Sequence, residues 1–273
     1  MRRVNLESIL PQPPELAEGT TTPLLVRARE QDTNELVDIV LKLVPPAGHT
    51  HEAYPTYVTC AEIIGTHILH AIGLHPAEPF WVSLTPIVIE ITRDPVIRAR
   101  LAGQPSHLFA CRYLESGRYA DVKINTPLKD PHHLTECHTL FGGDNWILNA
   151  DRGRHFGAIN LRISAEHIHP YDHGCAFTSL LNNPPTGTVS LSSAEQKNHI
   201  AHKPLMKKKR GNYDESFEQL IKDKVDEQLI DSLQAFCFEV GLHDFDIQKI
   251  FDHLKEKLGQ TELFRTRLNQ AFP

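Results

Sequence analysis

The stretch from Asp144 to Phe177 decides the fold of this chain. It contains three informative segments, DNWILNADR (144–152), NLRI (160–163) and HPYDHGCAF (169–177). Each segment places a polar residue beside a short apolar run, and these residues are Asp151, Asn160 and Asp172. Two carboxylates and one amide at loop positions offer a proton acceptor and hard oxygen ligands for a cation such as Mg²⁺.

Two motifs in this stretch resemble those of HipA-like kinases and, more distantly, of phosphatidylinositol kinases. Asn149-x-Asp151-Arg152 is similar to their catalytic-loop motif Asn-x-Asp-Arg. Asp172-His173-Gly174-x-Ala176-Phe177 is similar to their form of the metal-binding Asp-Phe-Gly motif. The resemblance implies a protein-kinase-like fold that uses ATP and Mg²⁺ to transfer the γ-phosphoryl group to a hydroxyl acceptor, such as a protein serine or threonine.

The resemblance also implies roles for four residues. Asp151 would orient or deprotonate the acceptor hydroxyl, and Arg152 would support its loop or contact the transferred phosphoryl group. Asp172 and Asn160 would hold Mg²⁺. One spacing departs from protein kinases, in which the metal-binding asparagine comes five residues after the catalytic aspartate. Here Phe156 occupies the asparagine position and Asn160 lies nine residues after Asp151, so we interpret the interval between them as a lengthened loop.

The composition is that of an ordinary globular protein. The chain has 273 residues, of which 40% are hydrophobic and 23% charged, which suits one two-lobed domain or two small ones. A net charge of −6 gives no overall attraction to nucleic acid, and we interpret the basic run 207–210 as a solvated loop. No apolar stretch approaches the roughly 18 residues of a membrane helix.

Several features lead us to expect a cytoplasmic protein. The five cysteines are scattered and form no Cys-x-x-Cys pair, which fits a reducing compartment and argues against a disulfide framework. Arg2 and Arg3 are not followed by an apolar core, so no signal peptide is evident.

The first part of the chain is expected to form a sheet. We interpret residues 1–18, rich in proline and acidic residues, as an N-terminal arm. Apolar runs at 24–29 and 36–44 predict a hairpin, joined by a turn. The loop that enters this hairpin contains Thr20, Thr21 and Thr22. Their hydroxyl and N–H groups could cover nucleotide phosphates, although ordinary turn chemistry explains them equally well.

Lys42 interrupts the second apolar run and therefore needs a partner, because an unpaired buried charge is costly. Glu62 lies in a predicted helix over 55–72, with Pro55 in its first turn and Gly73 after its end. A kinase uses a strand lysine on the nucleotide phosphates, held by a helix glutamate. Lys42 and Glu62 fit this order, and the alternative is a pair of surface residues that point to water.

The apolar run 80–91 predicts one or two strands, and 93–103 a short helix. Residues 107–114 predict a further strand, similar in position to the strand that leads to a kinase hinge. The backbone of Arg112, Tyr113 and Leu114 would then pair with adenine. Residues 134–148 predict a helix that leads to Asp151, and helical patterns dominate again from 214 onward. The whole predicts an α+β, two-lobed fold with a small antiparallel-sheet lobe at 19–115 and a mainly helical lobe at 116–273.

Two other classes of function stay open. The lengthened catalytic loop and the absence of a glycine-rich motif favour a nucleotide-binding pseudokinase that acts as an interaction module. A histidine-ligated metal hydrolase is the other, because His167, His169 and His173 carry zinc-type ligands. The chain lacks the P-loop, dinucleotide-binding and nucleophile-elbow motifs, which excludes those classes. The phosphoryl acceptor is open among proteins, lipid headgroups and small molecules.

Overall fold

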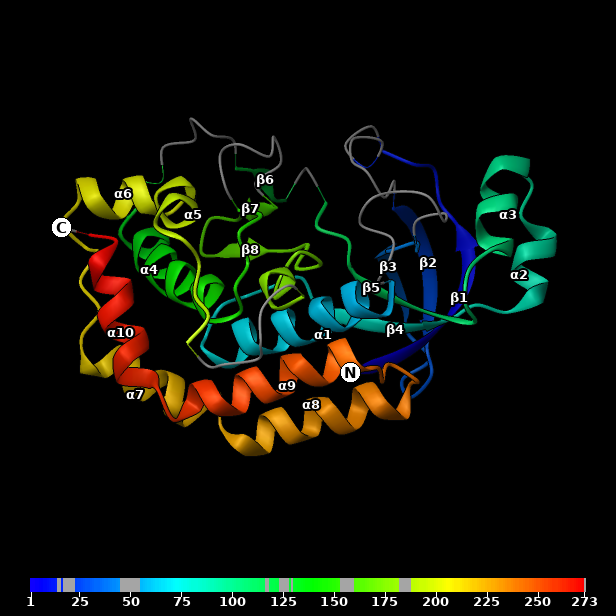
Figure 1. The fold of residues 1–273 in the computed structure, drawn as a ribbon. Coiled ribbons are helices and arrows are strands. Elements are labelled where there is room, and N and C mark those ends of the chain that lie inside the picture. The colour runs from blue at the N-terminus through cyan, green and yellow to red at the C-terminus, as the bar shows by residue number, and fades with distance from the viewer. Residues whose placement is uncertain are drawn as a thin grey trace. The chain divides into compact units, whose positions relative to one another are not determined.

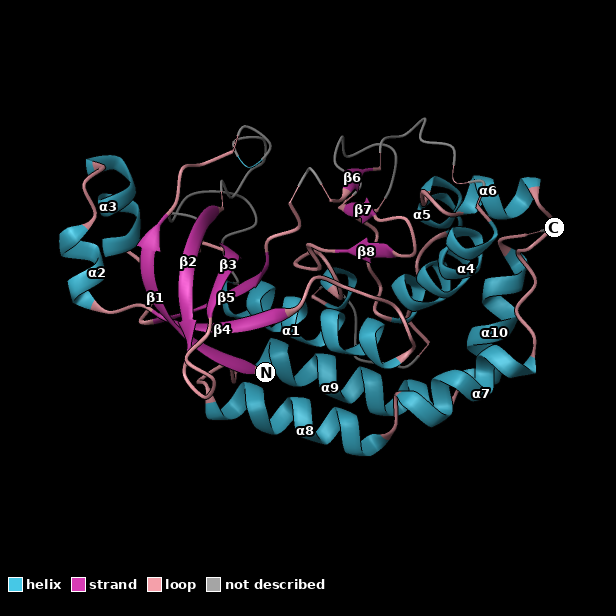
Figure 2. Cartoon of the chain, turned by 180° about the vertical axis from the view of Figure 1, so that it is seen from behind, coloured by secondary structure: helices cyan, strands magenta, loops and turns pink. Residues whose placement is uncertain are grey.

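The computed structural model describes residues 1–13, 16, 23–44, 55–115, 118–122, 128, 130–152, 160–181 and 188–272. The chain divides into two compact units, Met1–Pro55 with Ala77–Glu115, and Thr56–Pro76 with Ser116–Pro273. The first unit is built around strands and the second is mainly helical (Figures 1 and 2). The predicted α+β class, with a strand-rich part followed by a helical part, is confirmed.

The first unit is a closed barrel of five strands in the order β1-β2-β3-β5-β4. The strands are β1 (Arg2–Ile9), β2 (Leu24–Glu30), β3 (Leu36–Leu41), β4 (Pro79–Ser83) and β5 (His107–Arg112). Neighbours pair antiparallel except β1 and β4, which run parallel. The predicted hairpin is present as β2 and β3. Alternation along β2 buries Leu24, Val26 and Ala28 in the barrel core.

Two expectations for this unit were wrong. Residues 2–9 are not part of an arm but form β1, whose buried Val4 and Leu6 join the barrel core. The second half of the apolar run 80–91 is not a strand but helix α2 (Pro86–Ile91). Proline suits the first turn of a helix, where its missing N–H leaves no hydrogen bond unmade. Helix α3 (Pro95–Ala102) forms where a short helix was expected.

The second unit is organised around helix α4 (Pro131–Trp146). Its first turn is capped by Asp130, which accepts a hydrogen bond from the N–H of His132. Every residue from Leu140 to Trp146 is buried, so the second half of α4 lies in the core of this unit. The other helices are α1 (Pro55–Ala71), α5 (Ser193–Asn198), α6 (His202–Lys207), α7 (Glu215–Lys224), α8 (Glu227–Glu239), α9 (Phe245–Leu258) and α10 (Thr261–Gln270).

A small antiparallel sheet completes the second unit. It has the order β6-β7-β8, with β6 (Ala120–Asp121), β7 (Leu161–Ile163) and β8 (Ile168–Pro170). A short 3-10 helix, η2, covers Thr178–Leu180. Figure 2 shows the sheet beside α4, and α8 and α9 running next to each other. None of the helices in the described residues has the length and apolar character needed to cross a membrane.

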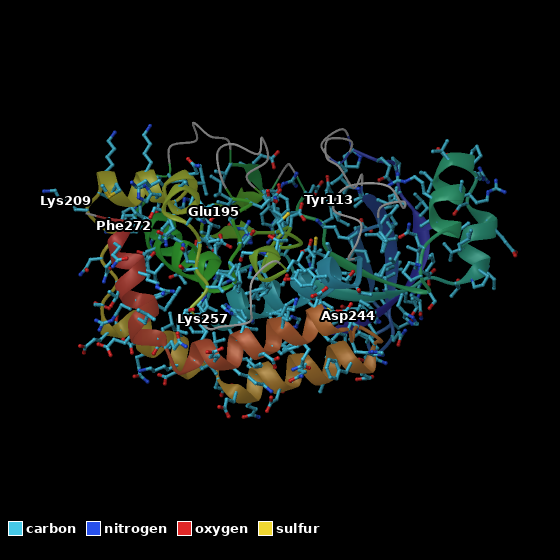
Figure 3. The ribbon with its side chains drawn as sticks, viewed as in Figure 1. Tyr113, Glu195, Lys209, Asp244, Lys257 and Phe272 are labelled. Carbon is cyan, nitrogen blue, oxygen red and sulfur yellow. The ribbon has the colours of Figure 1, made fainter. Side chains whose placement is uncertain are left out.

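Lys257 caps the C-terminal end of α4. It lies near the end of α9, is labelled in Figure 3, and is buried. Its Nζ donates to the main-chain carbonyls of Trp146 at 2.8 Å and Asn145 at 3.3 Å, which have no partner inside their own helix. Burial, with a smaller contribution from Arg267, lowers the pKa of Lys257 to about 7. Lys257 thus holds the point from which the chain enters residues 147–152.

We expect Lys257 to make the protein more stable as the pH rises from about 7 to about 9. An unfolded lysine has a pKa of about 10.4, so in this window the unfolded state keeps a proton that the folded state has lost. The free energy of unfolding then increases with pH. A folded pKa of about 7 corresponds to an increase of about 2 kcal/mol across the window.

Urea unfolding at several pH values measures this effect. Lys257→Met should lose the increase, whereas Lys255→Met, which removes an exposed lysine of the same helix, should keep it. If Lys257→Met retains the wild-type dependence on pH, the titration of Lys257 is not its source.

Candidate active site

The hairpin of β7 and β8 brings two of the predicted ligands to one end of the small sheet. Leu161 pairs with Pro170, and the N–H of Tyr171 donates to the carbonyl of Asn160 at 3.1 Å. Asn160 directly precedes β7, and Asp172 lies just after β8. Residues that are well separated in sequence are therefore held at the same end of a hairpin.

Asp151 and Asn160 are in direct contact. The Nδ2 of Asn160 donates to the Oδ2 of Asp151 at 2.8 Å. The N–H of Asp151 donates to the Oδ1 of Asn149 at 3.2 Å, so the first asparagine of the motif shapes the turn that presents the aspartate. Because Asn160 uses its amide nitrogen on Asp151, its amide oxygen is the atom suited to a cation. Residues 153–159, interpreted above as a lengthened loop, lie outside the described residues.

Arg152 is fully buried, and its guanidinium joins three parts of the chain. Its Nε donates to the Oδ2 of Asp144 on α4 at 2.6 Å. Its Nη1 donates to the carbonyls of Asn160 and, at 3.2 Å, Tyr171. Its Nη2 donates to the Nδ1 of His173 at 2.8 Å. Of the two predicted roles for Arg152, these contacts favour support of its own loop over contact with the phosphoryl group.

The charges in this buried cluster balance. Burial raises the pKa of Asp144, but Arg152 and then His199 outweigh this effect, so the carboxyl group stays ionised with its pKa below the ordinary value. His199 accepts from the N–H of Ala201 at Nδ1, so its proton is on Nε2, 2.9 Å from Asp144. His173 also carries its proton on Nε2, because a guanidinium only donates to its Nδ1. The imidazoles of His199 and His173 thus flank the buried ion pair of Asp144 and Arg152.

Sequence reasoning missed Asp144 and His199. Asp144 begins the deciding stretch, but nothing in its immediate neighbours indicates an ion pair. His199 lies far from it in sequence, and a lone histidine carries no signal of its partner. An acidic residue in a fully buried helical turn does need a compensating charge, and this requirement is the one available clue.

Glu62 connects helix α1 to the loop that carries Asp172. It is 3% exposed, and its Oε2 accepts from the N–H of His173 at 2.8 Å. Two glycines permit this close approach. A Cβ at Gly174 would lie 2.9 Å from Cγ1 of Val58, and one at Gly65 would lie 2.8 Å from Cβ of His173. The glycine in the Asp-His-Gly motif is therefore required by packing against α1.

Left-handed backbone conformations concentrate in this region. Leu148, Asn160, Asp172 and Phe177 have φ values of 56°, 51°, 58° and 62°. Such conformations are unfavourable for residues with a side chain and persist where surrounding bonds hold them, often at functional sites. Phe177 is held by hydrogen bonds from its N–H to the carbonyl of Ile147 and to its carbonyl from the hydroxyl of Tyr57.

The remaining predicted residues belong to the first unit or lie outside the description. Thr20, Thr21 and Thr22 lie outside the described residues. Lys42 directly follows β3 and is half-buried, and its N–H donates to the carbonyl of Phe109 at 3.0 Å. Because Lys42 and Glu62 belong to different units, their pairing stays a prediction.

The segment predicted to pair with adenine lies at the end of β5 in the first unit. The N–H groups of Arg112 and Tyr113 donate to the carbonyls of Glu78 at 2.8 Å and Asp38 at 3.1 Å. Tyr113 is labelled in Figure 3. These two N–H groups are already used within the barrel, so pairing with adenine would depend on carbonyl groups or on the backbone of Leu114.

The histidines behind the hydrolase alternative do not form one cluster. His173 accepts a hydrogen bond from Arg152 in the buried cluster around Asp144. His169 contacts the carbonyl of His75 and the hydroxyl of Ser164, while His167 lies beside His75 and Glu136. Among the described residues, His167, His169 and His173 therefore do not form the metal site that this alternative would need.

Comparison with known proteins supports the fold. Neither a family model nor a curated protein sequence matches this chain. Among solved structures, the chain is similar to the crystal structure of a Helicobacter pylori proinflammatory kinase, CtkA, with a TM-score of 0.52 and 13% sequence identity over 98% of both chains. The chain has a kinase-like fold. At this identity the similarity concerns the fold, and it confirms the kinase-like architecture expected from the two motifs.

Within this kinase-like fold, loss of Arg152 should destabilise the protein strongly. Removing one partner of a buried ion pair leaves an uncompensated charge and costs about 3–5 kcal/mol. We therefore expect Arg152→Ala to lower the free energy of unfolding by roughly that amount in urea denaturation.

The matched control is Arg27→Ala. Arg27 pairs with Asp38 at 2.7 Å, but both side chains are exposed, by 44% and 40%. Exposed pairs contribute about 0–1 kcal/mol, so the control should stay within that range. Equal losses for the two variants would mean that Arg152 does not bridge the three segments in solution.

Proposed function

We propose that this protein is a kinase that uses ATP and Mg²⁺ to transfer the γ-phosphoryl group to a hydroxyl acceptor, a protein serine or threonine. One observation carries the proposal. On a kinase-like fold, the Nδ2 of Asn160 lies 2.8 Å from the Oδ2 of Asp151, at the end of the hairpin that leads into Asp172. A base, an amide oxygen and a metal-binding carboxylate are the groups that phosphoryl transfer requires.

The available oxygen donors suit Mg²⁺. Asp172 supplies a carboxylate and Asn160 an amide oxygen, which are hard ligands that leave room for water and phosphate oxygens. In the proposed site these two residues would hold the ion, which neutralises charge on the phosphates when it is bound. The side chain of Asn160 is already oriented by its contact with Asp151.

Asp151 would act on the acceptor. The oxygen of the acceptor hydroxyl would bond to the γ-phosphorus, and a carboxylate oxygen of Asp151 would take the hydroxyl proton. The bond between the γ-phosphorus and the oxygen of the leaving ADP would break in the same step. The contact from Asn160 holds the Asp151 carboxylate in one orientation. Arg152 acts as a positioning residue, because its contacts fix Asn160 and the loop after β8.

The nucleotide would be held mainly by the first unit. Lys42 would contact the phosphates with Glu62 as its partner, and Thr20, Thr21 and Thr22 would lie over them. The backbone at Arg112–Leu114 would receive adenine. The contact of Glu62 with the N–H of His173 supports one part of this assignment, because it holds the helix glutamate at the loop that carries Asp172.

Asp151→Asn should separate binding from chemistry. The substitution keeps the shape and an acceptor for Asn160 but removes the base. We therefore expect ATP affinity to be retained while γ-phosphoryl transfer falls by about 10²–10⁴-fold. Both quantities are measured on one preparation, with radiolabelled ATP and a set of acceptors that includes the protein itself, extract proteins, lipids and small hydroxyl compounds.

Glu166→Gln, which removes an exposed carboxylate in the turn between β7 and β8, is the matched control and should keep both activities. A wild-type protein that binds ATP with Mg²⁺ but transfers phosphate to no acceptor would establish the pseudokinase alternative.

Asp172→Asn should weaken ATP binding only when Mg²⁺ is present. Loss of the carboxylate is expected to weaken Mg²⁺-dependent ATP binding by about tenfold or more, which corresponds to at least about 1.4 kcal/mol. ATP binding measured in EDTA should change little. Titration calorimetry with and without Mg²⁺ compares the two conditions, and an equal loss in both would show that Asp172 acts on the fold and not on the ion.

A further inference from the structure

A second group of ligand-type side chains is not used by the proposed phosphoryl transfer. His75, Glu136 and His167 each present one ligand atom, and these atoms all lie within 4.8 Å of one another. They come from the connection after α1, from α4 and from the turn between β7 and β8. We propose that this cluster binds a transition-metal dication of the Zn²⁺ type.

The ligand chemistry selects this class of ion. Two imidazole nitrogens and one carboxylate oxygen are typical of Zn²⁺ and its neighbours, whereas Mg²⁺ prefers oxygen alone. With metal–ligand distances of about 2.0–2.2 Å, tetrahedral ligands lie about 3.3–3.5 Å apart. Glu136 Oε1 is 2.8 Å from Nδ1 of His167 and 3.9 Å from Nε2 of His75. These two distances lie on either side of the required value. Binding an ion would also require the rings of His75 and His167, whose centroids are 3.7 Å apart, to turn so that their nitrogens converge on it.

Glu136 is oriented before any ion binds. Its Oε2 accepts from the N–H of Ile168 at 2.7 Å, which turns Oε1 toward the two imidazoles. Hydrogen bonds of this kind to the atoms behind a ligand fix its geometry and raise metal affinity.

The backbones that carry the two histidines are also held. The N–H of His167 donates to the hydroxyl of Ser164 at 3.1 Å. His169 contacts the same hydroxyl through Nε2 at 3.1 Å and the carbonyl of His75 through Nδ1 at 3.0 Å. Ser164 and His169 therefore link the segments that carry His75 and His167. The imidazole rings of His75 and His167 lie with their centroids 3.7 Å apart.

An ion from solution can reach this cluster. The side chains of His75 and His167 are 46% and 40% exposed, and that of Glu136 is 15% exposed. Three protein ligands leave a fourth position for water.

The competing interpretation is a simple hydrogen bond from Nδ1 of His167 to Glu136. The two interpretations differ in which ring nitrogen of His167 carries the proton. In the metal complex Nδ1 binds the ion and the imidazole proton is on Nε2, whereas in the hydrogen bond the proton stays on Nδ1. A bound ion would brace the β7–β8 turn against α4 and the connection after α1.

The test uses the full-length, untagged chain and Zn²⁺ alone. Titration against a chromogenic chelator gives stoichiometry and affinity, and Co²⁺ substitution gives the absorption bands of a nitrogen- and oxygen-ligated site. We expect one equivalent to bind and to raise the melting temperature. His75→Asn, Glu136→Gln and His167→Asn should each weaken affinity by about tenfold or more, since even outer contacts of a metal site contribute that much.

Controls are needed because the chain contains 17 histidines. His132→Asn and His243→Asn remove exposed histidines outside the cluster and should keep wild-type affinity. Circular dichroism of each metal-free variant verifies that it is folded. Absence of stoichiometric binding, or equal losses in the cluster and control variants, would overturn the proposal. Because the measurement is metal binding, its outcome is independent of the proposed phosphoryl transfer.

Discussion

The buried ion pair between Arg152 and Asp144 is the interaction on which the candidate active site depends. A guanidinium removed from water must find hydrogen-bond acceptors and a compensating charge. Arg152 meets these needs on three separate segments, at Asp144, at the carbonyls of Asn160 and Tyr171, and at His173. One side chain therefore sets the relation between the end of α4, the start of β7 and the end of β8.

Other polar contacts act on the same region from neighbouring helices. Lys257 on α9 holds the last carbonyls of α4, His199 completes the environment of Asp144, and Glu62 on α1 holds the N–H of His173. Unfavourable left-handed conformations at Asn160 and Asp172 are sustained by this set of contacts. The backbone of this region is preorganised, as the proposed phosphoryl transfer would require.

The β7–β8 hairpin contributes to both proposed sites. One end carries Asn160 and leads into Asp172, whereas the turn at the other end carries His167 and contacts Glu136 on α4. A hairpin of three-residue strands has little stability of its own, so contacts at each end help to define its position. A metal ion at the turn would add such a contact without taking part in the chemistry at the other end.

The sequence by itself determined many of the local elements and the class of fold. Periodicity, caps and turn residues predicted the β2–β3 hairpin, helix α1 and most of α4, because these signals act between residues close in the chain. The two motifs around Asp151 and Asp172 predicted a kinase-like fold. Tertiary structure alone decided that residues 2–9 form a barrel strand, because the parallel partner β4 lies far along the chain. It also decided the partners of Arg152 and the meeting of His75 with Glu136 and His167, since buried charges and ligand atoms are matched by packing between distant segments, which no local pattern encodes.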